Sequence, residues 1–290
     1  MKRLDRSEII FKVLAYVLLT IFALACLYPF IYLVSASVSS VTAMNTGQVF
    51  LWPSGIGEGL QIEAYKEVFS DSQFWLAYCN TLFYTMYGTI VSMLVAITGA
   101  YALSKARLMF GRGFNFLLTF TMWFSAGLIP TYYNFKSLGV DNRYMYIIAL
   151  GFNAFNIILL RNYFSGVSTE IEEAATIDGA SEFQLLTRIY IPMSKASIAT
   201  VAMFYAISRW NGYLWAQMLL GTDDQPLQVY IRRTLDTVLE KANTGGVVLP
   251  YSPYSMQYAL LVCSIIPIIV IYPKIQKYFA AGVNVGGVKE

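Results

Sequence analysis

Six long apolar stretches constrain the fold of this chain more than any other feature of its sequence. A helix needs about 20 apolar residues to cross the hydrocarbon core of a bilayer. Charged residues make up only 13% of the 290 residues, and they cluster between the stretches rather than within them. We therefore expect an all-α integral membrane protein with six transmembrane helices, at residues 11–34, 81–104, 114–132, 144–160, 199–220 and 258–278.

The positions of lysine and arginine orient these spans, because both residues are enriched in cytoplasmic loops. Thirteen of them lie in the two termini and in the loops after the second and fourth spans, whereas the alternate loops hold six. We therefore expect a cytoplasmic N-terminus at residues 1–10, a six-span transmembrane domain at 11–279 and a cytoplasmic tail at 280–290. The last outer loop supports this orientation least, because its three basic residues equal the number in an inner loop.

Several functional classes are excluded by residues and motifs that the sequence lacks. The chain has no histidine, which removes histidine-based catalysis and histidine metal sites, and we expect no catalytic residue and no metal. It has no Gly-x4-Gly-Lys-Ser/Thr phosphate loop, so it would not bind ATP in that way. A net charge of +3 is too small to suggest nucleic acid. Apart from Arg209 the spans hold almost no ionisable group, which argues against an intramembrane enzyme.

The inner loop at residues 161–197 is polar and acidic, unlike the spans on either side of it. Ser168 or Thr169 can cap a helix whose first turn carries carboxylates. Gly179 can end that helix, because glycine tolerates a positive φ. A second helix can start at Ser181 and end before Pro192. The residues alone leave two interpretations open, a docking element for another subunit and an interfacial amphipathic helix without a partner.

The same loop carries a pattern that resembles the EAA signature of ABC importer permeases. Glu173–Ala175, Gly179, Ile189 and Pro192 match it in register, with Ile191 where leucine is usual. The resemblance covers nearly the whole chain and includes the MalG-like permeases of sugar importers and their LplC-like subgroup, which is often tied to complex or acidic oligosaccharides. The further segments that carry it are Asn80–Leu82, Gly127–Thr131, Leu138–Gly139, Asp178–Ser181, Trp210–Asn211 and Gly282–Lys289.

The resemblance implies a type I (MetI-like) permease in the bacterial cytoplasmic (inner) membrane. Such a subunit moves oligosaccharides, including acidic, uronate-containing ones, by alternating access. Its implied partners are a second homologous permease, two ATPase subunits, an extracytoplasmic sugar-binding protein and membrane lipid. ATP and magnesium would bind to the ATPase subunits, and this chain would bind no cofactor. Permeases for another solute such as glycerol phosphate, and a non-transporting membrane scaffold, stay open as alternatives.

In this family the EAA loop docks in a groove of the ATPase subunit, which assigns a coupling role to residues 161–197. The C-terminal tail of relatives also reaches toward the ATPase, although this chain ends in Lys289–Glu290 where Lys-Gly is usual. The implied coupling residues are Glu172, Glu173, Ala174, Ala175, Asp178, Gly179, Ala180, Phe183, Ile189 and Pro192, with Gly287, Val288 and Lys289 in the tail.

Arg209 lies within the fifth span, where a charge is costly and usually faces a cavity or a partner. It is a candidate for the translocation path, where it could bind a sugar hydroxyl or carboxylate. A structural contact with the partner subunit or with a backbone carbonyl is the alternative. The other candidates for the path are Trp210, Asn211 and Trp215 beside it, and Asn153 and Asn156 in the fourth span, which could equally form hydrogen bonds between helices.

Overall fold

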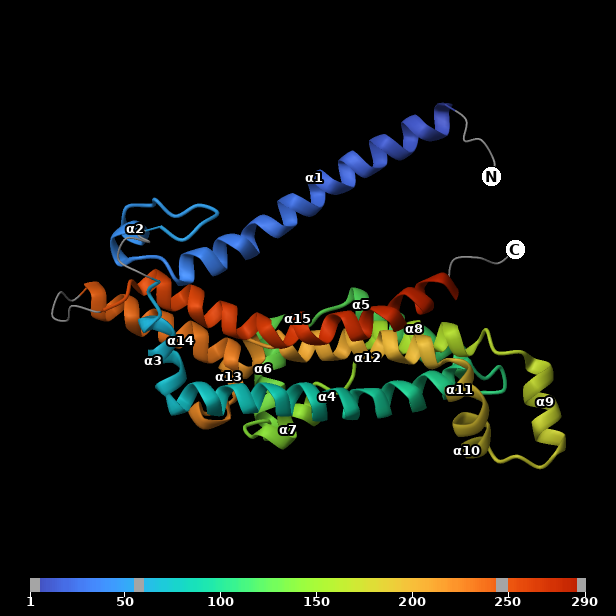
Figure 1. The fold of residues 1–290 in the computed structure, drawn as a ribbon. Helices are drawn as coiled ribbons and strands as arrows, with labels where there is room; N and C mark the ends of the chain where they lie inside the picture. Colours follow the sequence, from blue (N-terminus) through green and yellow to red (C-terminus); the bar gives the residue numbers. More distant parts are fainter. Residues whose placement is uncertain (1–5, 55–59, 244–249, 286–290) are drawn as a thin grey trace. The chain divides into compact units, whose positions relative to one another are not determined.

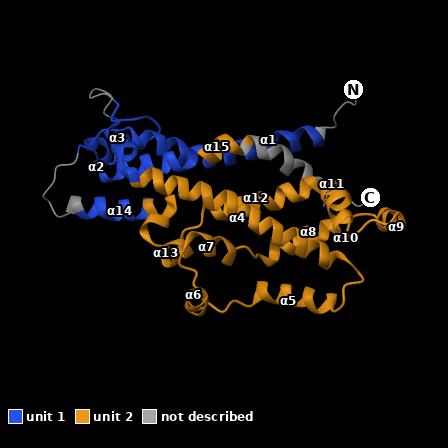
Figure 2. Ribbon diagram, turned by 90° about the horizontal axis from the view of Figure 1, so that it is seen from below, with its two compact units in different colours: residues 1–72, 231–266 blue, residues 73–230, 267–290 orange. Residues whose placement is uncertain are grey.

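The computed structural model describes residues 6–54, 60–243 and 250–285, and every regular element within these ranges is a helix. This confirms the all-α class. The chain divides into two compact units, residues 1–72 with 231–266 and residues 73–230 with 267–290 (Figure 2). The divisions fall after Ser72 and within α14 (Leu227–Asn243) and α15 (Pro253–Val285).

The first unit contains α1 (Arg6–Ser37), α2 (Val41–Asn45) and α3 (Glu63–Ser70). The apolar side chains of α1 are largely exposed from Ile9 to Val34, as suits a helix that faces lipid or another subunit. Its last turn is buried, and Ser37 Oγ lies 2.7 Å from the hydroxyl of Tyr65 in α3.

The second unit is built on α4 (Ser72–Ser104), which runs for 33 residues without a proline or a break. It packs with α8 (Ala154–Phe164) and α12 (Lys195–Trp210) around a buried cluster that includes Ala96, Leu160 and Val201. Small residues on α4 let the helix backbones approach closely. A second cluster, nearer the start of α4, joins Tyr84 to Tyr146 and Val229.

Three of the expected spans are divided, so the prediction of continuous helices at 114–132, 144–160 and 199–220 was wrong. The third consists of α5 (Gly111–Trp123) and α6 (Leu128–Ser137), bent by 119° where Gly127 has a φ of +87°. The fourth consists of α7 (Arg143–Ala149) and α8, bent by 54°, and Asn153 caps the new helix. The fifth ends at Trp210, before α13 (Leu214–Leu219).

By length and composition, three described helices are long and apolar enough to cross a membrane, at Ser7–Ser37, Ser72–Ser104 and Pro253–Ile271. The number rises to as many as six if each bent helix pair counts as one span. The chain is therefore a helical membrane protein whose spans are partly broken.

Candidate functional site

The 161–197 loop folds into two short helical segments joined by a tight turn, near the end of α4 at Ser104 (Figure 1). The first, α9 (Thr169–Ile177), begins after Ser168 and carries two glutamates in its first turn, where the helix dipole favours negative charge. It ends at Gly179, whose φ is +83° and whose N–H donates to the Thr176 carbonyl at 3.0 Å. The prediction that Gly179 ends this helix through a positive φ is confirmed.

The second segment starts as predicted but ends later. Ser181 and Gln184 form a capping box at the start of α10 (Glu182–Leu185). The helix then widens into a π-helical turn, η2 (Leu186–Tyr190), and continues as α11 (Ile191–Met193), so Pro192 lies inside it. The prediction that the helix ends before Pro192 was wrong. A proline removes a donor and crowds the carbonyl four residues earlier, and the wider π turn accommodates both effects.

The predicted coupling residues of the loop separate into an outward and an inward group. Glu173, Ala174, Asp178 and Phe183 are exposed, as is Pro192. The inward group is Glu172, Ala175, Ala180 and Ile189, whose side chains are partly buried.

The sequence interpretation missed Ile177, whose side chain is 86% exposed beside the turn, as Phe183 is at 73%. A large apolar residue directly before Asp178–Gly179 was the signal that could have found it. Together these residues present a mixed apolar and acidic surface, which is the composition of a docking surface rather than of a lipid-facing one.

Glu172 is partly buried and pairs with Lys105, directly after α4. The Lys105 Nζ lies 2.7 Å from Glu172 Oε1 and donates a hydrogen bond to the Tyr190 hydroxyl at 2.9 Å. The Tyr190 hydroxyl in turn donates to Glu172 Oε2 at 2.5 Å. The same Nζ lies 4.4 Å from the ring centroid of Tyr101 and 4.1 Å from that of Tyr190.

A second set of contacts joins α10 to the end of α4 and to the residues that follow it. The Tyr101 hydroxyl donates to Glu182 Oε2 at 2.6 Å, and Arg107 pairs with both Glu182 and Glu172. Sequence reasoning missed Tyr101, Lys105 and Arg107, because they lie far from the loop along the chain. We call the six residues the Lys105 cluster: Tyr101, Lys105, Arg107, Glu172, Glu182 and Tyr190.

The electrostatics of the cluster keep Glu172 ionised. Burial raises the pKa of this carboxyl, but the hydrogen bonds from Lys105 and Tyr190 and the nearby positive charges outweigh burial, so its pKa lies below the ordinary 4.5. A lowered folded-state pKa contributes stability above the unfolded value, and this contribution is lost as the pH falls below 4.5. The ion pair is therefore intact at neutral pH.

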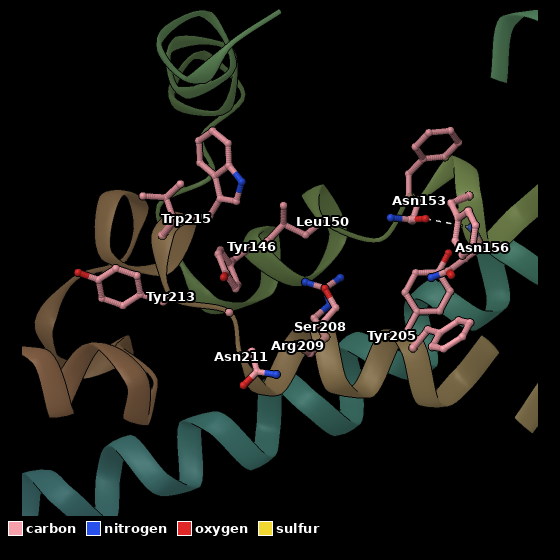
Figure 3. A pocket seen from close by; sticks show the side chains of 15 residues that line it. Tyr146, Leu150, Asn153, Asn156, Tyr205, Ser208, Arg209, Asn211, Tyr213 and Trp215 are labelled. Carbon is pink, nitrogen blue, oxygen red and sulfur yellow. Dashed lines mark hydrogen bonds between the residues drawn. The ribbon is translucent and has the colours of Figure 1, made fainter. Parts of the chain in front are cut away.

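Arg209 borders a cavity of about 700 Å³ between α7, α8, α12 and α13 (Figure 3). Its side chain is only 8% exposed. Nη2 donates to Ser92 Oγ at 3.2 Å and to the Ile147 carbonyl at 3.1 Å, whereas Nη1 is buried with no partner among the described residues. A Cβ added to Gly88 would lie 2.9 Å from Arg209 Nε, so the glycine makes room for the guanidinium. The hydrogen bond to the Ile147 carbonyl agrees with a structural role for Arg209, and its position beside the cavity agrees with a role in the translocation path.

Most of the other predicted path residues lie around the same cavity. Asn153 and Asn156 are near one end of it and Trp215 is near the other, with Asn211 between them (Figure 3). Asn153 Oδ1 accepts a hydrogen bond from the Asn156 N–H at 3.0 Å and so caps α8. Trp210 is buried and does not line this cavity; it borders a smaller apolar pocket near Pro267.

The predicted tail residues Gly287, Val288 and Lys289 lie outside the described residues. Within the ranges that the structure describes, no group of three or more acidic or cysteine side chains could hold a metal ion.

Comparison with known proteins gives a match along nearly the whole chain. Residues 1–285 match the family described as binding-protein-dependent transport system inner membrane component. The chain is 34% identical to the polygalacturonan/rhamnogalacturonan transport system permease protein YtcP of Bacillus subtilis, over 97% of this chain and 98% of that protein. It is 35% identical to protein LplC of the same organism, over 90% of this chain and 88% of LplC.

A solved structure shows the same fold. A chain from the crystal structure of a bacterial ABC transporter involved in the import of the acidic polysaccharide alginate superposes with a TM-score of 0.84. The two chains are 44% identical, and the match covers 96% of this chain and all of the other.

Proposed function

Since the chain belongs to the family of binding-protein-dependent transport system inner membrane components, we propose that it is a permease subunit of an ATP-driven importer of oligosaccharides. The observation that carries the proposal is the full-length likeness to YtcP and to a chain of the alginate transporter, both of which are named for polysaccharide transport. The partners are a second permease, two ATPase subunits, which hold ATP and magnesium, and an extracytoplasmic sugar-binding protein.

The proposed arrangement in the membrane has six spans within residues 11–279, with both termini and the 161–197 loop in the cytoplasm. It is supported by the distribution of lysine and arginine, by the three long helices, by the bent pairs α5–α6 and α7–α8, and by α12. The tail at 280–290 would lie on the same side as the loop.

The proposed route of energy coupling is the surface formed by Glu173, Ile177 and Phe183. These side chains are exposed, and the turn that presents them is defined by Gly179 and by the capping box at Ser181. A rigid turn transmits the displacement of a docked ATPase, whereas a flexible loop would absorb it. Glu173 supplies a carboxylate for a basic group on the ATPase.

The test is Glu173→Arg in the reconstituted importer, measured as ATP hydrolysis stimulated by sugar-loaded binding protein. We expect the subunits to assemble but the stimulation to fall about tenfold or more, because an ion pair becomes a repulsion. The matched control is Glu8→Arg, an exposed acidic residue at the start of α1 on the same proposed side of the membrane. Unchanged stimulation in the Glu173 variant would refute the coupling role, and failure to co-purify with any ATPase would refute the importer itself.

We further propose that the substrate is an acidic oligosaccharide and that Arg209 interacts with its carboxylates. YtcP is named for polygalacturonan and rhamnogalacturonan, and the solved transporter imports an acidic polysaccharide. Arg209 lines a cavity of about 700 Å³ together with most of the predicted path residues, and its Nη1 has no partner among the described residues. A buried donor without a partner carries a free-energy cost, and an incoming acceptor on the substrate would remove that cost.

The substrate proposal is tested by Arg209→Gln, with uptake of an acidic and of a neutral oligosaccharide measured in the same vesicles. We expect the ratio of acidic to neutral uptake to fall about tenfold, whereas damage to the fold would lower both uptakes together. Arg143→Gln is the control, because Arg143 is also partly buried but pairs with Asp224 and does not line the cavity. Equal losses for both sugars in the Arg209 variant would assign the residue a structural role.

A further inference from the structure

One ammonium group holds both segments of the 161–197 loop. Lys105 directly follows α4, its side chain is only 8% exposed, and it contacts Glu172 in α9 and Tyr190 in η2. To move α9 away from α4, the ammonium and the carboxylate would have to separate in a mostly buried setting. Breaking a buried ion pair is strongly unfavourable, because it leaves an uncompensated charge. The loop and the end of α4 are therefore joined by an ion pair that is costly to break.

The side chains of Tyr101 and Tyr190 enclose this contact. Their rings lie edge to face, with centroids 5.0 Å apart, and Nζ of Lys105 lies within 4.4 Å of each centroid. Both hydroxyls donate to loop carboxylates, one to Glu182 and one to Glu172. Because the Lys105 and Glu172 side chains are only 8% and 18% exposed, their charge pair is screened less than a pair at the surface would be.

The other end of α4 is held equally firmly to a second segment. Asn80 Nδ2 donates to the carbonyl of Asp223 at 2.7 Å, and the Tyr84 hydroxyl donates to the carbonyl of Asp224 at 2.7 Å. Thr81 Oγ1 accepts from the Leu227 N–H at 2.7 Å. Between the two ends α4 has no proline and no break, unlike the third, fourth and fifth spans of the same unit.

We infer that Lys105 is a positioning residue that locks the 161–197 loop to α4, so that loop and helix move as one body and displace the turn at residues 222–227. The inference rests on the proposed function, since it assigns the path by which a docked ATPase would move the spans. It adds a residue outside the loop, Lys105, that fixes the position of the loop relative to α4.

The experiment measures the distance between two spin labels by pulsed electron resonance, in the full chain in lipid nanodiscs. One label replaces Glu170 on α9 and the other replaces Leu94 on α4, both exposed positions. Lys105→Met keeps the aliphatic stem and removes the charge, and we expect it to broaden the distance distribution about twofold. Arg112→Met is the control, because Arg112 is exposed in the first turn of α5, the helix that follows α4, and forms no ion pair with any described residue.

A second variant separates positioning from general damage. The exchange Lys105→Glu with Glu172→Lys restores the pair with reversed polarity, and we expect it to recover most of the narrow distribution. An unchanged width in Lys105→Met, or an exchange variant as broad as the single variant, would overturn the inference. These distances need no ATPase, so a failure of the Glu173→Arg test would refute the coupling role without changing the result for Lys105.

Discussion

At the residue scale, neighbouring side chains in this chain make different contacts. Glu172 and Glu173 are adjacent and acidic, and the family pattern suggests the same coupling role for both. A helix turns about 100° per residue, so in α9 Glu172 faces Lys105 while Glu173 faces outward. The identity of the residues was readable from the sequence, but their separate roles were not, because the partner of Glu172 lies 67 positions earlier in the chain.

Gly88 is a residue whose importance only the structure shows, because it lets the Arg209 side chain cross α4. We predict that Gly88→Ala lowers the stability by about 1–3 kcal/mol, since the added methyl group displaces a guanidinium held by Ser92 and Ile147. The measurement is thermal unfolding of the purified protein in detergent.

Gly99→Ala is the matched control for that prediction. It lies in the same helix, and its added Cβ would make an ordinary 3.7 Å contact with Ile157. An alanine there should be neutral or slightly stabilising, because alanine is the better helix former. If both variants unfold at the same temperature, Gly88 has no special role in seating Arg209.

At the element scale, caps and turns decide how the 161–197 loop is shaped. A helix start at Ser181 and a helix stop at Gly179 were predicted from residue type, and the structure adds the capping box that Ser181 forms with Gln184. The π turn before Pro192 was not predictable, since it depends on how the segment packs: Leu185, Leu186 and Tyr190 are all buried. The breaks in the third and fourth spans were missed for a related reason. Hydropathy shows how long an apolar segment is, but it does not show where the helix axis changes direction.

The turn at Gly179 yields the prediction at this scale. Gly179→Ala should cost about 1–2 kcal/mol, because an L residue is strained in the left-handed region. No atom lies within 4 Å of the added Cβ, so the cost comes from the backbone and not from a clash. We expect faster amide hydrogen exchange in α9 and α10. Gly113→Ala, which also meets open space but has no positive φ, should leave that exchange unchanged.

At the scale of the whole molecule, the fold is that of a permease chain with both an outward loop surface and an internal cavity. The two are contributed by the same compact unit, residues 73–230 with 267–290. α4 belongs to that unit from Gln73 onward and contacts the Lys105 cluster at one end and the 222–227 turn at the other. This arrangement suits a subunit that converts a displacement on one side of a membrane into one on the other.

The orientation is tested at this scale by cysteine labelling. In a variant with Cys26, Cys79 and Cys263 replaced by serine, a single cysteine is placed at Glu173 or at Trp52, which is 80% exposed. We expect a membrane-impermeant maleimide applied to intact cells to label position 52 and to label position 173 only after the cells are opened. The reverse pattern would overturn the proposed topology.

The sequence by itself determined the class of this protein. Its long apolar stretches hold few charged residues, and such stretches are stable in a bilayer rather than exposed to water. The helix stop at Gly179 and the helix start at Ser181 were also readable from the sequence, because both are local effects, whereas the register from Glu173 to Pro192 came from the family resemblance. Only the tertiary structure decided which loop carboxylate faces inward, where Arg209 is anchored and where the spans break. These depend on side chains that meet across α4 from distant parts of the chain, and no local pattern encodes such contacts.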